Sequence, residues 1–244
     1  MTNEILKYLE QFKFIELYFG EPFLQKAISN YSSRKTNSIP FYHLANFICW
    51  AFCRKHYEFF IELEEMLKYF YSGSHLQEYL LSRKVRKHLK SRDEIEFHSI
   101  WSELIFAFFL SKRDFEVIKI GQAKGEASEQ ADIVTNKGLF EVTLVLSEKD
   151  KQMIGEAFFG SNEVDEISKK LINNKIQTKI NQNEAKNIVI DCTFMESLYE
   201  KLMTTYTIGI KTDFNVFRKV EKKVFLFIRN PHIHQLGILQ EICI

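Results

Sequence analysis

Residues 131–146 read ADIVTNKGLFEVTLVL, and this stretch decides the fold of the second half of the chain. It contains two apolar runs with several β-branched residues, which are typical of strands. Between the runs, Asn136-Lys137-Gly138 is a tight-turn signal, because glycine adopts positive φ angles without steric cost. The stretch therefore predicts a hairpin whose strands cover residues 131–135 and 139–146.

The segments on either side of this hairpin extend it into an α/β domain. Upstream, residues 94–110 have an apolar helical pattern, and residues 115–120 alternate like a strand. Downstream, the patterns predict two helices and two strands, at residues 163–182 (helix), 188–194 (strand), 196–204 (helix) and 224–228 (the last clear strand). This order predicts an α/β sandwich with a mixed sheet.

The first 93 residues carry only helical patterns. Apolar residues recur at helical spacing in four segments, at residues 5–14, 39–52, 59–71 and 76–81. The basic stretch at residues 83–92 is either the end of a helix or a hinge. We therefore expect a helical N-terminal region at residues 1–93 and an α/β domain at residues 94–244.

The composition of the chain argues against a secreted, disulfide-rich or membrane-spanning protein. The 244 residues carry a net charge of only +1, so the overall charge does not by itself indicate a nucleic-acid partner. None of the four cysteines has a partner at C-x-x-C spacing, and the first residues lack a secretion signal. The longest apolar stretch, residues 100–110, is too short to span a bilayer. We expect a cytoplasmic protein with no membrane partner.

Basic residues are nevertheless clustered locally. Such clusters either contact phosphates or form solvated helix faces, and the sequence leaves both interpretations open. There are three clusters: Arg83, Lys84, Arg86, Lys87, Lys90 and Arg92; Lys169, Lys170, Lys175 and Lys179; and Lys219, Lys222 and Lys223.

Three acidic residues are candidates for a site. Glu103 lies on a predicted helix face that is otherwise apolar, and a buried carboxylate needs a cation, a hydrogen-bond donor or a metal. Asp132 and Glu141 lie on the two strands of the hairpin, which brings them to the same end of the sheet. Each acid alone also has a structural interpretation: Glu103 as a partner of a basic residue, Asp132 as a loop terminator, and Glu141 as a solvent-facing strand residue.

In their order and context, these acids resemble the motif of the PD-(D/E)xK, or restriction-endonuclease-like, nuclease superfamily. The core of that family is a helix, a three-stranded meander, a helix and a further strand, and the resemblance covers roughly residues 94–195. It matches Glu103 to the acid of the first helix, Asp132 to the strand aspartate and Glu141 to the glutamate of E-x-K. The resemblance implies a restriction-endonuclease-like core with a mixed central sheet flanked by helices.

The chain departs from the family at the lysine of E-x-K, where it has Thr143. In some members the lysine has migrated to the following helix. Here the predicted helix at residues 163–182 places Lys175 and Lys179 on one stripe, and we expect one of them to take that role. Lys169 and Lys170 point elsewhere and are expected at the surface or in contact with phosphates.

The resemblance implies a Mg²⁺- or Mn²⁺-dependent DNA endonuclease, in restriction or phage defence. Asp132, Glu141, the Val142 carbonyl and Glu103 would be the metal ligands, and Arg83, Lys84, Arg86 and Lys87 would join Lys169 and Lys170 in binding DNA. A homodimer is compatible with cutting both strands. Two alternatives remain: an inactive nuclease-fold protein that binds nucleic acid or protein, and a helical interaction module fused to an unrelated α/β domain.

Overall fold

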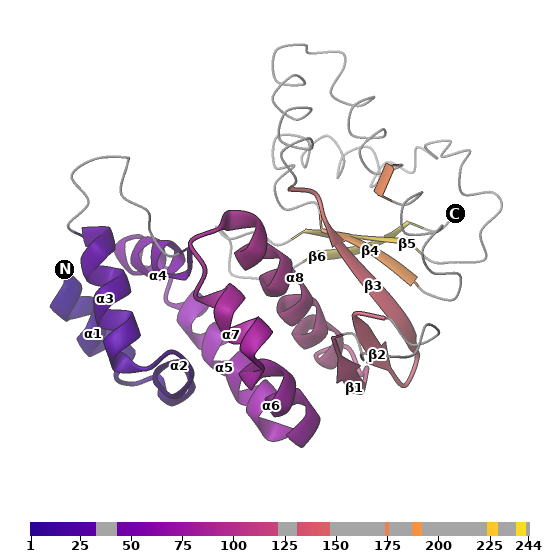
Figure 1. The fold of residues 1–244 in the computed structure, drawn as a ribbon, viewed down its shortest axis with the longest axis horizontal. Helices are drawn as coiled ribbons and strands as arrows, with labels where there is room; N and C mark the ends of the chain where they lie inside the picture. The colour runs from indigo at the N-terminus through magenta and orange to yellow at the C-terminus, as the bar shows by residue number, and fades with distance from the viewer. Residues whose placement is uncertain are drawn as a thin grey trace, which may run out of the picture. The chain divides into compact units, whose positions relative to one another are not determined.

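The computed structural model describes residues 1–32, 43–121, 131–146, 174–175, 187–191, 224–228 and 238–242. The chain divides into two compact units, one covering residues 1–109 and the other beginning at Leu110. We call them the helical unit and the sheet unit. In the described residues, helices precede a mixed sheet (Figure 1), which confirms the predicted α/β class and the helical N-terminal region.

Eight helices lie in the described part of the first 111 residues. They are α1 (Thr2–Leu9), α2 (Lys13–Phe19), α3 (Glu21–Ser32), α4 (His43–Cys53), α5 (Glu58–Ser72), α6 (Ser74–Leu81), α7 (Arg83–Leu89) and α8 (Glu94–Ser111). Their order matches the helical patterns of the sequence, and α2, α3 and α7 are additional helices.

Aromatic rings fill much of the core of the helical unit. Helix α2 packs against α5, and α1 and α4 pack against α3. The ring of Tyr8 lies 5.1–5.5 Å from the rings of four other aromatic residues, namely Phe12, Phe52, Tyr57 and Phe60. Phe60 is fully buried. The many phenylalanines of the sequence therefore act here as core residues at helical spacing.

The helical unit differs from the sequence prediction in three places. Helix α3 was not predicted, and the first predicted segment is two helices, α1 and α2. The basic stretch is neither a helix end nor a hinge but a separate helix, α7. The hydroxyl of Ser82 caps α7 by accepting the Val85 N–H at 3.3 Å, while Val85 and Leu89 are buried.

The described strands form one sheet in which they lie in chain order. Neighbours pair antiparallel from β1 to β3, parallel from β3 to β5, and antiparallel between β5 and β6. The strands are β1 (Val117–Ile120), β2 (Ile133–Thr135), β3 (Gly138–Leu144), β4 (Asn187–Asp191), β5 (Val224–Ile228) and β6 (Ile238–Ile242). The prediction of 224–228 as the last strand was wrong, because β6 follows it. The predicted helices at 163–182 and 196–204 lie outside the described residues, except for the helical pair 174–175.

The predicted hairpin is confirmed. Strands β2 and β3 pair with Ile133 opposite Phe140 and Thr135 opposite Gly138, whose φ is +144°. The Thr135 hydroxyl donates to the Gly138 carbonyl at 2.9 Å and closes the turn. A side chain at Gly138 would be strained by this φ and would meet Asn187 Nδ2 at 3.1 Å.

Strand β1 does not alternate strictly as predicted. Its register against β2 shifts between Val117 and Lys119, so Ile118 is an extra residue in a β-bulge. Val117 and Ile120 are therefore both buried, although they are three residues apart.

No helix in the described part of the chain is long and apolar enough to cross a membrane.

Candidate functional site

Asp132 and Glu141 lie together in the sheet unit. Asp132 directly precedes β2, and continuing the β2–β3 register by one residue from Ile133 and Phe140 places it opposite Glu141. One carboxylate oxygen of Asp132, Oδ2, accepts the Val142 N–H at 2.8 Å. The predicted approach of these two acids is therefore present in the structure.

Both carboxylates are buried: Asp132 is 8% exposed and Glu141 is 3% exposed. Two negative charges on facing positions repel each other, and removing them from water adds to the cost. A hard divalent cation offsets both effects, and Mg²⁺ in proteins commonly takes one or two carboxylates together with water and substrate phosphate. The donor chemistry of this pair therefore fits Mg²⁺ or Mn²⁺.

In the described residues, no group of three or more His, Cys, Asp or Glu is arranged to hold a metal ion. Val142 is buried and its N–H is held by Asp132. Its carbonyl as a ligand stays a prediction.

Asp132 also has a structural role at the end of the hairpin. Its carbonyl accepts the Gly121 N–H at 2.7 Å, which continues the pairing of β1 and β2. Its side chain takes the Val142 N–H, which would otherwise pair with the next backbone carbonyl. The interpretation of Asp132 as a terminator of the loop and its interpretation as a ligand are therefore compatible, because these two bonds fix the orientation of its carboxylate.

Strand alternation separates two faces of β3. Phe140 and Val142 share one face, and Glu141 and Thr143 share the other. Asp191 of β4 is fully buried, but its register partner is Leu144, on the face opposite Glu141. Asp191 is therefore not a third member of the acid pair. Thr143, where the family lysine is expected, is half-buried on the Glu141 face.

Glu103 belongs to the helical unit. It is 8% exposed, as predicted for an acid on a buried face of α8. Its Oε2 accepts a hydrogen bond of 2.5 Å from the Tyr79 hydroxyl of α6. Glu103 thus has a hydrogen-bond donor within its own unit, and its predicted role as a metal ligand stays a prediction.

The predicted helix lysines are described in part. Lys175 is a half-buried helical residue of the sheet unit. Lys179, Lys169 and Lys170 lie outside the described residues.

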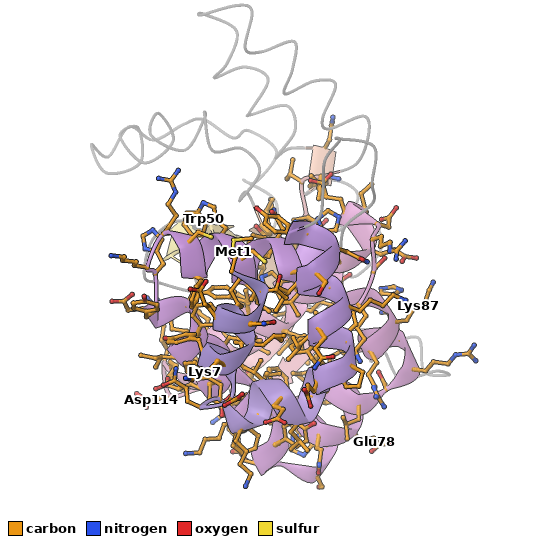
Figure 2. All side chains as sticks on the ribbon, turned by 90° about the vertical axis from the view of Figure 1, so that its left-hand side faces the viewer. Met1, Lys7, Trp50, Glu78, Lys87 and Asp114 are labelled. Atoms are coloured by element: carbon orange, nitrogen blue, oxygen red, sulfur yellow. The ribbon has the colours of Figure 1, made fainter. Side chains whose placement is uncertain are left out.

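The predicted DNA-binding residues of α7 lie at the surface. The exposed set is Arg83, Lys84, Arg86 and Lys87. Lys87, labelled in Figure 2, pairs with Glu96 at 3.2 Å. Lys90 differs from them, because it donates to the Phe19 carbonyl at 3.1 Å and lies over the Phe23 ring. Burial, with Arg86 nearby, lowers the pKa of Lys90. Lys90 therefore packs within the helical unit, whereas the other four are exposed, and their contact with phosphates stays a prediction.

One basic residue near the acids was missed by sequence reasoning. Lys119 pairs with Val134 of β2, and Val134 pairs with Leu139 of β3, two residues before Glu141. Strict alternation from Val117 would have placed Lys119 on the other face. The only signal in the sequence is a lysine within an apolar strand, and the bulge that redirects it is not readable there.

Comparison of the chain with protein-family models, curated proteins and solved structures gives no significant match.

Proposed function

We propose that this protein is a Mg²⁺-dependent nuclease that hydrolyses phosphodiester bonds of DNA. The observation that carries the proposal is the buried pair of Asp132 and Glu141 on facing positions of β2 and β3. Two carboxylates supply only part of the coordination sphere of a divalent cation, so a cation held by this pair would also bind water and substrate.

The order of elements around the pair supports the same proposal. Helix α8 precedes the antiparallel meander β1–β2–β3, and β4 then lies parallel to β3. This order is that of the PD-(D/E)xK core, with the acids on the second and third strands. Because one fold supports many functions, the topology adds weight only together with the acids.

Each residue of the site has its own role in the proposed mechanism. Asp132, held by the Val142 N–H, and Glu141 would hold Mg²⁺, and the ion would supply Lewis-acid chemistry for phosphodiester hydrolysis. The Thr143 hydroxyl is placed on the same face to orient water. Thr143 brings no positive charge, so a lysine elsewhere must stabilise the charge that develops in the transition state. Lys175 and Lys179 are the candidates from the family resemblance.

DNA is the proposed partner, and α7 of the helical unit offers a surface for it. The four exposed basic residues, Arg83, Lys84, Arg86 and Lys87, provide sequence-independent phosphate contacts. Lys169 and Lys170 are proposed to extend this binding. A setting in restriction or phage defence, and a homodimer that cuts both strands, follow from the resemblance alone.

Cleavage of plasmid and branched DNA with Mg²⁺ or Mn²⁺ tests the proposal. Glu141→Gln removes one ligand charge, and we expect at least about a 100-fold loss of cleavage. Asp132→Ala should have a similar effect while DNA binding persists. The matched control is Glu116→Gln, an exposed residue just before β1, which should cleave like the wild type. Equal cleavage by Glu141→Gln and the wild type would contradict the proposal.

Thr143 favours a second candidate, an inactive nuclease-fold protein that binds nucleic acid. It predicts DNA binding that depends on salt and on the α7 basic residues, but no cleavage under any metal. Replacing Arg83 and Lys84 by glutamate should weaken binding in either case. Cleavage that disappears in Glu141→Gln would exclude this candidate.

A further inference from the structure

We propose that Lys119, at the bulge of β1, is the catalytic lysine of the acid pair and takes the place of the lysine missing at Thr143. This proposal rests on the proposed nuclease function. It assigns a positive charge from the first strand rather than from the helix that follows the third. It concerns a residue for which neither the sequence pattern nor the family resemblance gives a role.

The register of three strands places Lys119 on the face of the acids. Lys119 is opposite Val134, and Val134 is opposite Leu139. Paired residues point to the same face of a sheet, and Leu139 and Glu141 are two residues apart on β3. Lys119 therefore shares its face with Glu141 and Thr143.

The same register places Lys119 within reach of Asp132. Asp132 is two residues before Val134, so it is the diagonal neighbour of Lys119. Diagonal neighbours have Cβ atoms roughly 7–8 Å apart, which long side chains bridge. Gly121 directly follows β1 and lies opposite Asp132, because its N–H donates to the Asp132 carbonyl. Gly121 has no side chain that could lie between Lys119 and Asp132.

The β-bulge is the device that turns Lys119 toward this face. Under strict alternation from Val117, Lys119 would share the face of the buried Val117, and Ile120 would lie on the other face. Bulges are over-represented next to active sites, where they re-aim a side chain. Lys119 is half-buried, which fits a long side chain whose apolar stem packs along the sheet.

A charge at this place has two opposite consequences. In the transition state the Lys119 ammonium group, with three N–H donors, stabilises the negative charge that develops on the phosphate oxygens. In the absence of DNA, the same charge repels a divalent cation at Asp132 and Glu141. Loss of the charge should therefore slow cleavage and tighten metal binding. The metal affinity reports the position of the charge, and the cleavage rate reports its role in the reaction.

The test compares Lys119→Met with Lys119→Arg and with Lys137→Met, an exposed lysine at the turn of the same hairpin. Cleavage is measured at saturating Mn²⁺, and Mn²⁺ affinity is measured separately by electron paramagnetic resonance without DNA. For Lys119→Met we expect cleavage to fall by about 100-fold or more. We expect its Mn²⁺ binding to tighten by about three- to tenfold. Lys119→Arg should keep the Mn²⁺ affinity and recover part of the cleavage, and Lys137→Met should match the wild type in both.

The outcomes separate this proposal from the proposed function. If the wild type cleaves and Lys119→Met cleaves equally, Lys119 is not the catalytic lysine, although the nuclease function stands. Unchanged or weaker Mn²⁺ binding in Lys119→Met also overturns the proposal. If the wild type binds Mn²⁺ but cleaves nothing, the nuclease function fails and the catalytic role of Lys119 fails with it. Tighter Mn²⁺ binding by Lys119→Met would then still support its position beside the acids.

Discussion

The helical unit and the sheet unit bury their polar groups in different ways. In the helical unit, two such groups have complementary partners: the Tyr18 hydroxyl donates to the Leu80 carbonyl, and Glu103 accepts from the Tyr79 hydroxyl. In the sheet unit, two like charges, Asp132 and Glu141, are buried on facing positions. A hydrogen-bonded pair stabilises a fold, whereas two facing like charges destabilise it unless a hydrogen bond or an opposite charge offsets their repulsion. This difference is the reason that we place the proposed cation site in the sheet unit.

The largest effect we expect is the loss of an aromatic ring from the helical core. Phe60→Ala should lower the free energy of unfolding by about 3–5 kcal/mol, because it opens a cavity among packed rings. Urea denaturation measures this change. The neighbouring Ile61→Ala, at an exposed position, should cost less than about 0.5 kcal/mol. A small effect of Phe60→Ala would mean that this core is not closely packed.

The second effect is specific to the sheet unit. At a Mn²⁺ concentration about 100 times the dissociation constant, the ion should stabilise the wild type by about 2.7 kcal/mol. Hydrogen exchange should show the added protection in β1–β3. Glu141→Gln should remove it, because the variant lacks one of the two carboxylate charges. Glu103→Gln serves as the comparison across units. If Glu103→Gln removes the stabilisation by Mn²⁺ as completely as Glu141→Gln does, this stabilisation is not specific to the sheet unit.

A third, intermediate effect concerns a carboxylate that caps a helix. The Glu64 side chain of α5 accepts the Phe14 and Ile15 N–H groups at 2.8 and 2.9 Å, at the start of α2. Glu64→Gln replaces charge-assisted bonds by weaker ones and should cost about 1–3 kcal/mol in urea denaturation. Glu78→Gln, at the exposed surface of α6 (labelled in Figure 2), makes the same chemical change and should cost almost nothing. Equal costs would show that Glu64 contributes nothing as a cap.

The smallest effect is a pH dependence in the helical unit. Burial, together with Lys87 and Lys84, lowers the pKa of His88 below the ordinary value of 6.5, although Glu96 and Asp93 oppose the shift. As the pH falls, the unfolded chain is protonated first. The stability that depends on neutral His88 is therefore present above about pH 6.5 and is lost as the pH falls through the lower folded pKa. His88→Gln should flatten the stability profile between pH 7.5 and 5. If the free energy of unfolding of His88→Gln depends on pH as steeply as that of the wild type, His88 is not the cause of the pH dependence.

The sequence predicted the elements that depend on local pattern. Residues 131–146 indicated the hairpin because two apolar runs flank a turn ending in Gly138, and the burial of Glu103 followed from helical periodicity. The facing of Asp132 and Glu141 followed from the hairpin itself. Helix α3 and strand β6 were missed, since their apolar patterns are weak and pairing rather than propensity decides β6.

The position of Lys119 could not be predicted for a different reason. A one-residue shift reverses the faces of a strand, and the bulge between Val117 and Lys119 arises from pairing with β2 rather than from the residues of β1. Because Thr143 stands where the family has a lysine, the sequence analysis proposed Lys175 and Lys179 of the predicted helix at residues 163–182. The register of the sheet adds Lys119, which precedes the two acids in the sequence, whereas Lys175 and Lys179 follow them.

The chain order of the sheet has a consequence for biosynthesis. Each described strand pairs with the strand that precedes it in the sequence, so the sheet can grow by one strand at a time as the ribosome delivers them. Domains that begin nearer the N-terminus fold first during translation, which gives α1–α7 a start before β1 emerges. Until β4 arrives, β3 is an open edge exposing the strand that carries Glu141, and open edges recruit other chains. The long segment between β3 and β4 is thus the interval in which the nascent protein most needs protection from aggregation.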